Sequence, residues 1–77
     1  MKLIWQDAEE IALGLLAKDP SVDPLTLRFT DLHRRVVDLP EFSDDPKGSN
    51  EGILEQIQMA WHEAYEEASR GQGKVGD

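Results

Sequence analysis

SNEGILEQIQMAWHEAYEEA, residues 49–68, is the longest stretch of the chain with helical periodicity. Ser49 or Asn50 has the side-chain oxygen needed to cap a helix at its start. Apolar residues then recur every three or four positions, which is the spacing of one buried helix face. The sequence predicts a helix to about residue 68, with Leu54 and Tyr65 flanking the inward residues Ile53, Ile57, Trp61, Ala64 and Ala68.

A first short helix is predicted over residues 7–18. Asp7 at the N-cap and Glu10 three residues later resemble an acidic capping box, and Asp19-Pro20 provides a stop. The predicted apolar stripe consists of Ala8, Ile11, Ala12, Leu15 and Leu16. Two prolines in residues 20–28 then disfavour helix and predict a structured connector with a short turn from Pro24.

A second short helix is predicted from a Thr30 cap to about Leu39, where Pro40 ends it. Its inward residues are Phe29, Leu32, Val36 and Leu39. Residues 41–48, named here the acidic loop, are rich in turn formers and acids, and Phe42 is their expected core anchor.

These elements predict a mainly α, small three-helix domain with minimal strand content, in which only residues 3–5 and 27–29 could form strands. One domain is expected over residues 1–69. Residues 70–77 contain three glycines in a polar run and are predicted to be a disordered tail.

The composition limits what the chain can do. Seventy-seven residues allow one small core, which disfavours most enzymes. A net charge of -8 repels nucleic acid and anionic lipid, attracts cations and basic protein surfaces, and favours a monomer. The absence of cysteine excludes disulfides and thiolate chemistry. No targeting or membrane-spanning segment is visible, so a soluble cytoplasmic protein is expected.

The sequence contains no recognisable catalytic motif. There is no strand-to-helix elbow for a serine nucleophile and no phosphate-binding glycine loop. His33 and His62 are interpreted as structural residues, with His62 and Glu66 forming a helix-surface pair. Trp5 and Trp61 are assigned to the core. We therefore expect a protein that is not an enzyme.

Carboxylates are the remaining chemical feature. Asp31 and Asp38 are seven residues apart on one helix face, and Glu41, Asp44 and Asp45 follow directly. Such a patch of oxygen ligands could bind Fe(II), Mn(II), Ca(II) or Mg(II) weakly. The same acids also fit two other interpretations: helix caps and turn formers on a solvated face, or an interface for a basic partner.

Several short motifs resemble a known family when they are taken in order. They are Trp5-Gln6-Asp7-Ala8-Glu9-Glu10-Ile11, Asp23-Pro24, Arg28-Phe29-Thr30-Asp31-Leu32-His33, Asp44-Asp45-Pro46 and Ser49-Asn50-Glu51. This series is similar to the IscX family, the small acidic accessory proteins of bacterial iron-sulfur cluster assembly. The similarity spans about residues 3–65.

The resemblance implies a winged-helix-like fold. It also implies that the protein is a non-enzymatic adaptor or regulator that binds a cysteine desulfurase, with other assembly proteins as possible further partners. It also implies weak Fe(II) binding with no tightly bound cofactor; the alternative is a stand-alone donor or buffer of divalent iron. Carried onto this chain, the metal and partner-binding residues are Asp31, Asp38, Glu41, Asp44 and Asp45, with Asp7, Glu10 and Glu51 as further partner-binding residues. We call these eight residues the acidic surface.

Two positions depart from the family pattern. Arg35 stands where relatives commonly have an aromatic residue, and Ser43 stands where some have another acid. Arg34 and Arg35 follow Asp31 by three and four residues, so helix-surface pairs are expected to neutralise part of the acidic surface.

Overall fold

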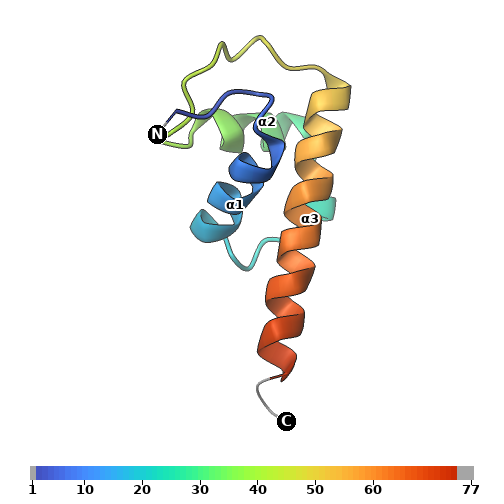
Figure 1. The fold of residues 1–77 in the computed structure, drawn as a ribbon. Helices are drawn as coiled ribbons and strands as arrows, with labels where there is room; N and C mark the ends of the chain where they lie inside the picture. The colour runs from blue at the N-terminus through green and yellow to red at the C-terminus, as the bar shows by residue number, and fades with distance from the viewer. Residues whose placement is uncertain (1, 75–77) are drawn as a thin grey trace.

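The computed structural model describes the backbone of residues 2–74 and the side chains of residues 2–70. Figure 1 shows the arrangement of its helices. They are α1 (Ala8–Lys18), the short 3-10 helix η1 (Pro24–Thr26), α2 (Phe29–Val37) and α3 (Glu51–Lys74). The predictions of a mainly α fold and of a turn from Pro24 are confirmed.

Strand pairing in the described residues is limited to one isolated parallel bridge between Leu3 and Phe42. Residues 3–5 thus contribute one bridge residue, whereas Phe29, in the second predicted strand region, begins α2. The winged-helix likeness stays a prediction, since the described part of the chain contains no strand from which a wing could form.

The three helices enclose one apolar core. In Figure 1, α1 lies beside the upper half of α3, and α2 lies across the same end of the fold. The predicted periodic faces meet there, because each helix buries the stripe that its spacing defines. Seven of these side chains are at most 1% exposed: Ile11, Ala12, Leu15, Leu32, Val36, Ile57 and Trp61. Trp5 is 3% exposed, so both tryptophans belong to the core as predicted.

Two helix starts differ from the predictions. Helix α2 begins at Phe29, with Arg28 at the N-cap position and no side-chain cap, so the prediction of a Thr30 cap is wrong. Asp7 does precede α1, but its carboxylate makes no hydrogen bond to the helix. Instead, Asp7 Oδ2 accepts the Ile4 amide at 3.1 Å, because the carboxylate turns back toward the preceding segment.

Helix ends also differ. α2 ends at Val37, and Leu39 enters the core from the turn that follows. α3 continues to Lys74 and so enters the segment predicted as a tail; residues 75–77 of that prediction lie outside the described residues. Ala68 is exposed and Leu54 is buried, because the core covers only the first part of α3.

Of the two predicted candidates, Ser49 and Asn50, it is Asn50 that caps α3, since its Oδ1 accepts the Ile53 amide at 2.9 Å. We expect Asn50→Ala to lower the free energy of unfolding by about 1 kcal/mol, because that amide loses its acceptor. Asn50→Asp, which keeps an acceptor oxygen, is the matched control and should remain close to the native protein. Urea denaturation followed by circular dichroism measures both, and equal losses in the two variants would contradict this cap assignment.

Candidate functional site

The acidic loop begins with a backbone pairing to the N-terminal segment. The Leu3 amide donates to the Glu41 carbonyl at 2.8 Å, and the Ser43 amide donates to the Leu3 carbonyl at 2.9 Å. Phe42 lies between these two bonds and packs against the core, as predicted for the loop anchor. The start of the loop is therefore fixed by a segment almost forty residues earlier in the chain.

Trp5 fixes the middle of the acidic loop. Its indole Nε1 donates to the Asp45 carbonyl at 2.6 Å, and its amide donates to Asp44 Oδ2 at 3.1 Å. The indole ring stacks on His33 at 5.4 Å and meets the Phe42 ring edge-on at 4.7 Å, both measured between ring centroids. A Cβ atom at Gly48 would lie 3.2 Å from the indole Cδ1 atom and from the Asp45 carbonyl oxygen. The loop thus closes tightly over Trp5.

Asp44 and Asp45 consequently hold the loop in shape. The two carboxylate oxygens of Asp44 accept separate amides, those of Trp5 and Asp45. Asp45 Oδ1 accepts the Lys47 amide at 2.9 Å. Asp44 is half-buried, whereas Asp45 is exposed. The turn-former interpretation therefore applies to both residues.

Asp38 and Glu41 present freer carboxylates. Both side chains are exposed, and both line a groove that runs past Leu39 and Pro40 to Gly14 and Ala17 of α1. Glu41 contributes its backbone carbonyl to the pairing with Leu3, so its side chain is not needed there. Of the five acids predicted as metal ligands, these two are the most available for contact with another molecule.

Asp31 lies among both acidic and basic side chains. It shares a groove with five other residues, which are Lys18, Asp19, Arg34, Arg35 and Asp38. Arg35 Nη1 contacts Asp19 Oδ2 at 2.7 Å, so the expected pair between Arg35 and Asp31 is replaced by an ion pair to the end of α1. The arginines still lower the negative potential on this side of α2.

The remaining acids of the acidic surface lie at helix starts. Glu10 and Glu51 are exposed in the first turns of α1 and α3, where a negative charge also stabilises the helix dipole. Asp7 is half-buried and bonded to the Ile4 amide. Glu10 and Glu51 can therefore contact a partner, whereas Asp7 has a structural role.

Among the described side chains, no three histidine or acidic groups are close enough together to hold a metal ion. The five acids predicted as ligands therefore do not form a preorganised cage. Two of the acids, Asp44 and Asp45, already accept backbone amides. The residues present do not fit a tightly bound iron ion, and weak Fe(II) binding stays a prediction.

The two histidines have the structural roles expected for them. His33 stacks on Trp5, and its Nε2 atom lies within hydrogen-bonding distance of the Pro46 carbonyl. His62 Nε2 lies 3.7 Å from Glu66 Oε2, one helical turn along α3. These contacts give His33 a place in holding the acidic loop, which the sequence did not indicate.

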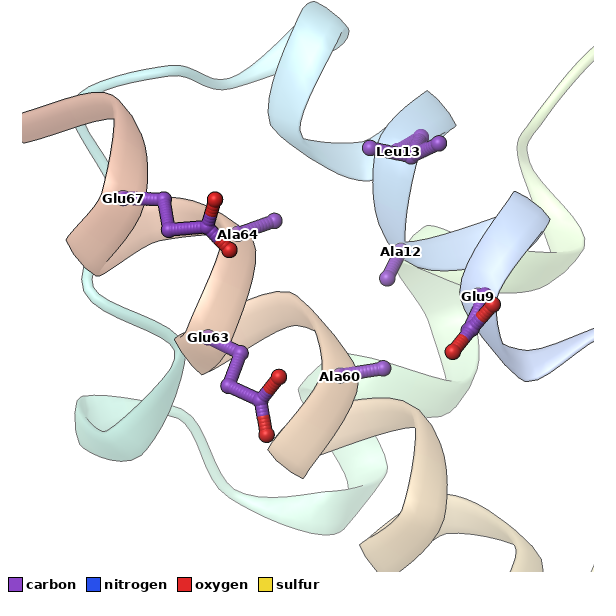
Figure 2. A pocket seen from close by; sticks show the side chains of 7 residues that line it. All are labelled: Glu9, Ala12, Leu13, Ala60, Glu63, Ala64 and Glu67. Carbon is purple, nitrogen blue, oxygen red and sulfur yellow. The ribbon is translucent and has the colours of Figure 1, made fainter. Parts of the chain in front are cut away.

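A third groove, which sequence reasoning missed, lies between α1 and α3 (Figure 2). Its residues are Glu9, Ala12, Leu13, Ala60, Glu63, Ala64 and Glu67. The four-residue spacings of Ala60 with Ala64 and of Glu63 with Glu67 were visible in the sequence. Their meeting with α1 was not, because it depends on how the two helices pack.

Comparison with known proteins identifies the family of the chain. The family model described as "Iron-sulphur cluster assembly" matches residues 3–66. The chain belongs to this family. The resemblance to the IscX family is thereby confirmed. One relative is the "Uncharacterized protein PA3808" of Pseudomonas aeruginosa. It is 56% identical to this chain over 63 residues, which cover 82% of this chain and 96% of the relative.

Within residues 2–74, no helix of this iron-sulphur cluster assembly protein combines the length and the apolar character needed to span a membrane. α3 is 24 residues long, but charged side chains interrupt it throughout.

Proposed function

We propose that this chain is a non-enzymatic adaptor of iron-sulphur cluster assembly that docks on a basic patch of a cysteine desulfurase. Its cytoplasmic location and monomeric state are part of the proposal. The observation that carries it is the pair of exposed carboxylates of Asp38 and Glu41, at the start of the acidic loop that Trp5 fastens to the core. The family membership supplies the pathway.

Fixed position makes these charges useful for recognition. A carboxylate on a rigid segment loses little conformational freedom when it meets a lysine or arginine, so more of the electrostatic attraction is retained in the complex. The net charge of -8 adds a long-range attraction that accelerates encounter with a basic surface. Screening limits this effect to about 8 Å at physiological ionic strength, so binding should weaken as salt is raised.

Fe(II) enters the proposal only as a weak modulator. Ions that associate with the acidic surface would compete with a basic partner for the same carboxylates, since both are attracted by negative charge. Tight, stoichiometric Fe(II) binding by the isolated protein would instead favour the stand-alone iron donor or buffer. Anaerobic calorimetry with Fe(II) alone distinguishes the two cases.

Reversing the two exposed carboxylates tests the proposal. We expect Asp38→Lys combined with Glu41→Lys to weaken binding to a purified cysteine desulfurase by about tenfold or more at low salt, because two favourable charge contacts become repulsive. Isothermal titration calorimetry measures the affinity. Circular dichroism should show an intact fold, since a lysine at the C-cap of α2 suits the helix dipole and the Glu41 side chain makes no structural bond in the described residues.

The control carries the same change in net charge elsewhere. Glu63→Lys combined with Glu67→Lys alters exposed residues of α3 in the groove between α1 and α3. Desulfurase binding should survive in this variant with a reduction no greater than the general loss of negative charge explains. An equal loss of affinity in both variants would refute the assignment of binding to the acidic surface. Reversal of Asp44 is unsuitable because it would also release the loop.

A further inference from the structure

The groove between α1 and α3 has an apolar floor. Ala60 and Ala64 point from α3 toward α1, and Ala12 points back toward α3 (Figure 2). Leu13 continues this floor outward and is 58% exposed, which leaves most of a large apolar side chain in water. The groove has a volume of about 200 Å³. Small alanine side chains on both helices create this space, because they allow the helices to approach without filling the outer part of their contact.

The rim of the groove is entirely acidic. Glu63 and Glu67 lie one turn apart on α3, and Glu9 faces them from α1 (Figure 2). All three side chains are exposed, and no lysine, arginine or histidine lines the groove. The ion pairs found within residues 2–70 involve Asp19 and Glu66 and leave these three glutamates free. The uncompensated charges surround an apolar centre.

We propose that this groove docks a basic amphipathic helix of a partner protein. An apolar residue of that helix would contact Leu13 and the alanine floor, and lysine or arginine residues beside it would meet the three rim glutamates. Glu63 and Glu67 are separated by about 6 Å along α3, which matches cations four residues apart on the partner helix. Charge complementarity therefore specifies the occupant as cationic.

The same charges argue against other occupants. A second copy of this chain would bring three more glutamates against the first three, and like charges brought together in an interface cost several kcal/mol. Anionic lipid headgroups would be repelled in the same way. The groove lies on different residues from the acidic surface, so this inference stands independently of the proposed desulfurase binding.

A synthetic peptide provides a direct test. The probe is a fluorescently labelled, acetylated helix of lysine, leucine and alanine, with leucines on one face and lysines at four-residue spacing beside them. A scrambled peptide of the same composition is the control for charge alone. Fluorescence anisotropy of the full-length chain with each peptide is measured at low and high salt. We expect the amphipathic peptide to bind, the scrambled peptide to bind at least several-fold more weakly, and salt to weaken both.

Two double variants locate the binding site. Glu63→Lys with Glu67→Lys should weaken binding of the amphipathic peptide by about tenfold, whereas Asp38→Lys with Glu41→Lys should change it far less. Leu13→Ser should weaken binding at both salt concentrations, because it removes apolar contact and leaves the charges in place. Circular dichroism of each variant checks the fold.

Two kinds of result would overturn the inference that the groove docks a basic helix. Equal weakening by both double variants, or equal affinity for the scrambled peptide, would show that net charge alone attracts the peptide and would overturn the inference. A concentration-dependent dimer that Leu13→Ser abolishes, seen by analytical ultracentrifugation, would assign the groove to a second copy and would also overturn it. Since no desulfurase is present, the peptide results do not depend on the proposed desulfurase binding.

Discussion

Replacing Trp61 with alanine is expected to lower the free energy of unfolding by about 3–5 kcal/mol. Trp61 has no solvent exposure and is the largest fully buried side chain of the core. Its removal leaves a cavity that the three surrounding helices cannot close without breaking their own contacts. Because a domain of this size has a total stability on the order of 5–10 kcal/mol, the variant should lose a large part of its stability. Urea denaturation monitored by circular dichroism measures the loss.

Trp61→Phe is the informative control. The indole Nε1 of Trp61 is buried and has no hydrogen-bond partner among the described residues. Phenylalanine removes this unpaired donor while retaining an aromatic ring, so the relief of an unsatisfied polar group offsets part of the lost packing. We expect Trp61→Phe to lie within about 1.5 kcal/mol of the native protein. A loss as large as that of the alanine variant would contradict the view that aromatic volume, rather than the indole nitrogen, matters here.

Trp5→Ala should have the second large effect, about 3–4 kcal/mol, together with loosening of the acidic loop. The substitution removes a side chain that is 3% exposed, its hydrogen bond to the Asp45 carbonyl, and its ring contacts with Phe42 and His33. The amides of Lys47 and Gly48 bond to Asp45 and should exchange with solvent much faster once the loop is released. Hydrogen exchange followed by nuclear magnetic resonance reports this local effect.

Trp5→Phe separates packing from hydrogen bonding. It should keep the aromatic contacts and lose only the bond to Asp45, at a cost of about 1 kcal/mol. The Asp45 carbonyl still accepts the Gly48 amide at 2.9 Å, so it is not left without a partner. Unchanged exchange rates at Lys47 and Gly48 in Trp5→Ala would show that Trp5 does not hold the loop. Should the rates rise as expected, desulfurase affinity should fall in the same variant although no charge has changed.

The carboxylates of the acidic surface differ in their surroundings. Asp44 and Asp45 accept backbone amides and give the loop its shape, whereas Asp38 and Glu41 are exposed, and the proposed function assigns partner contact to them. All four are ordinary aspartates and glutamates in the sequence. Only their surroundings separate them, since a carboxylate that accepts two amides has fewer lone pairs left for a ligand.

Local patterns were enough to predict most of the helical framework. The three-to-four-residue spacing of apolar side chains defines the buried stripe of each helix, and it correctly placed Ile57 and Trp61 in the core. Asn50 and Pro24 were predictable because caps and proline turns depend on a few neighbouring residues. Helix boundaries were less predictable: nothing local distinguishes Phe29 from Thr30 as the start of α2.

The sequence by itself determined the acidic charge, the absence of thiol chemistry, the helical core and the family motifs. The tertiary structure alone decided that Trp5 binds a loop forty residues away, that Arg35 pairs with Asp19, and that α1 and α3 form an acid-rimmed groove. The physical reason is the separation along the chain over which each kind of interaction acts. Periodicity and capping act between residues a few positions apart, whereas these contacts depend on how distant segments pack, which spacing along the chain does not specify.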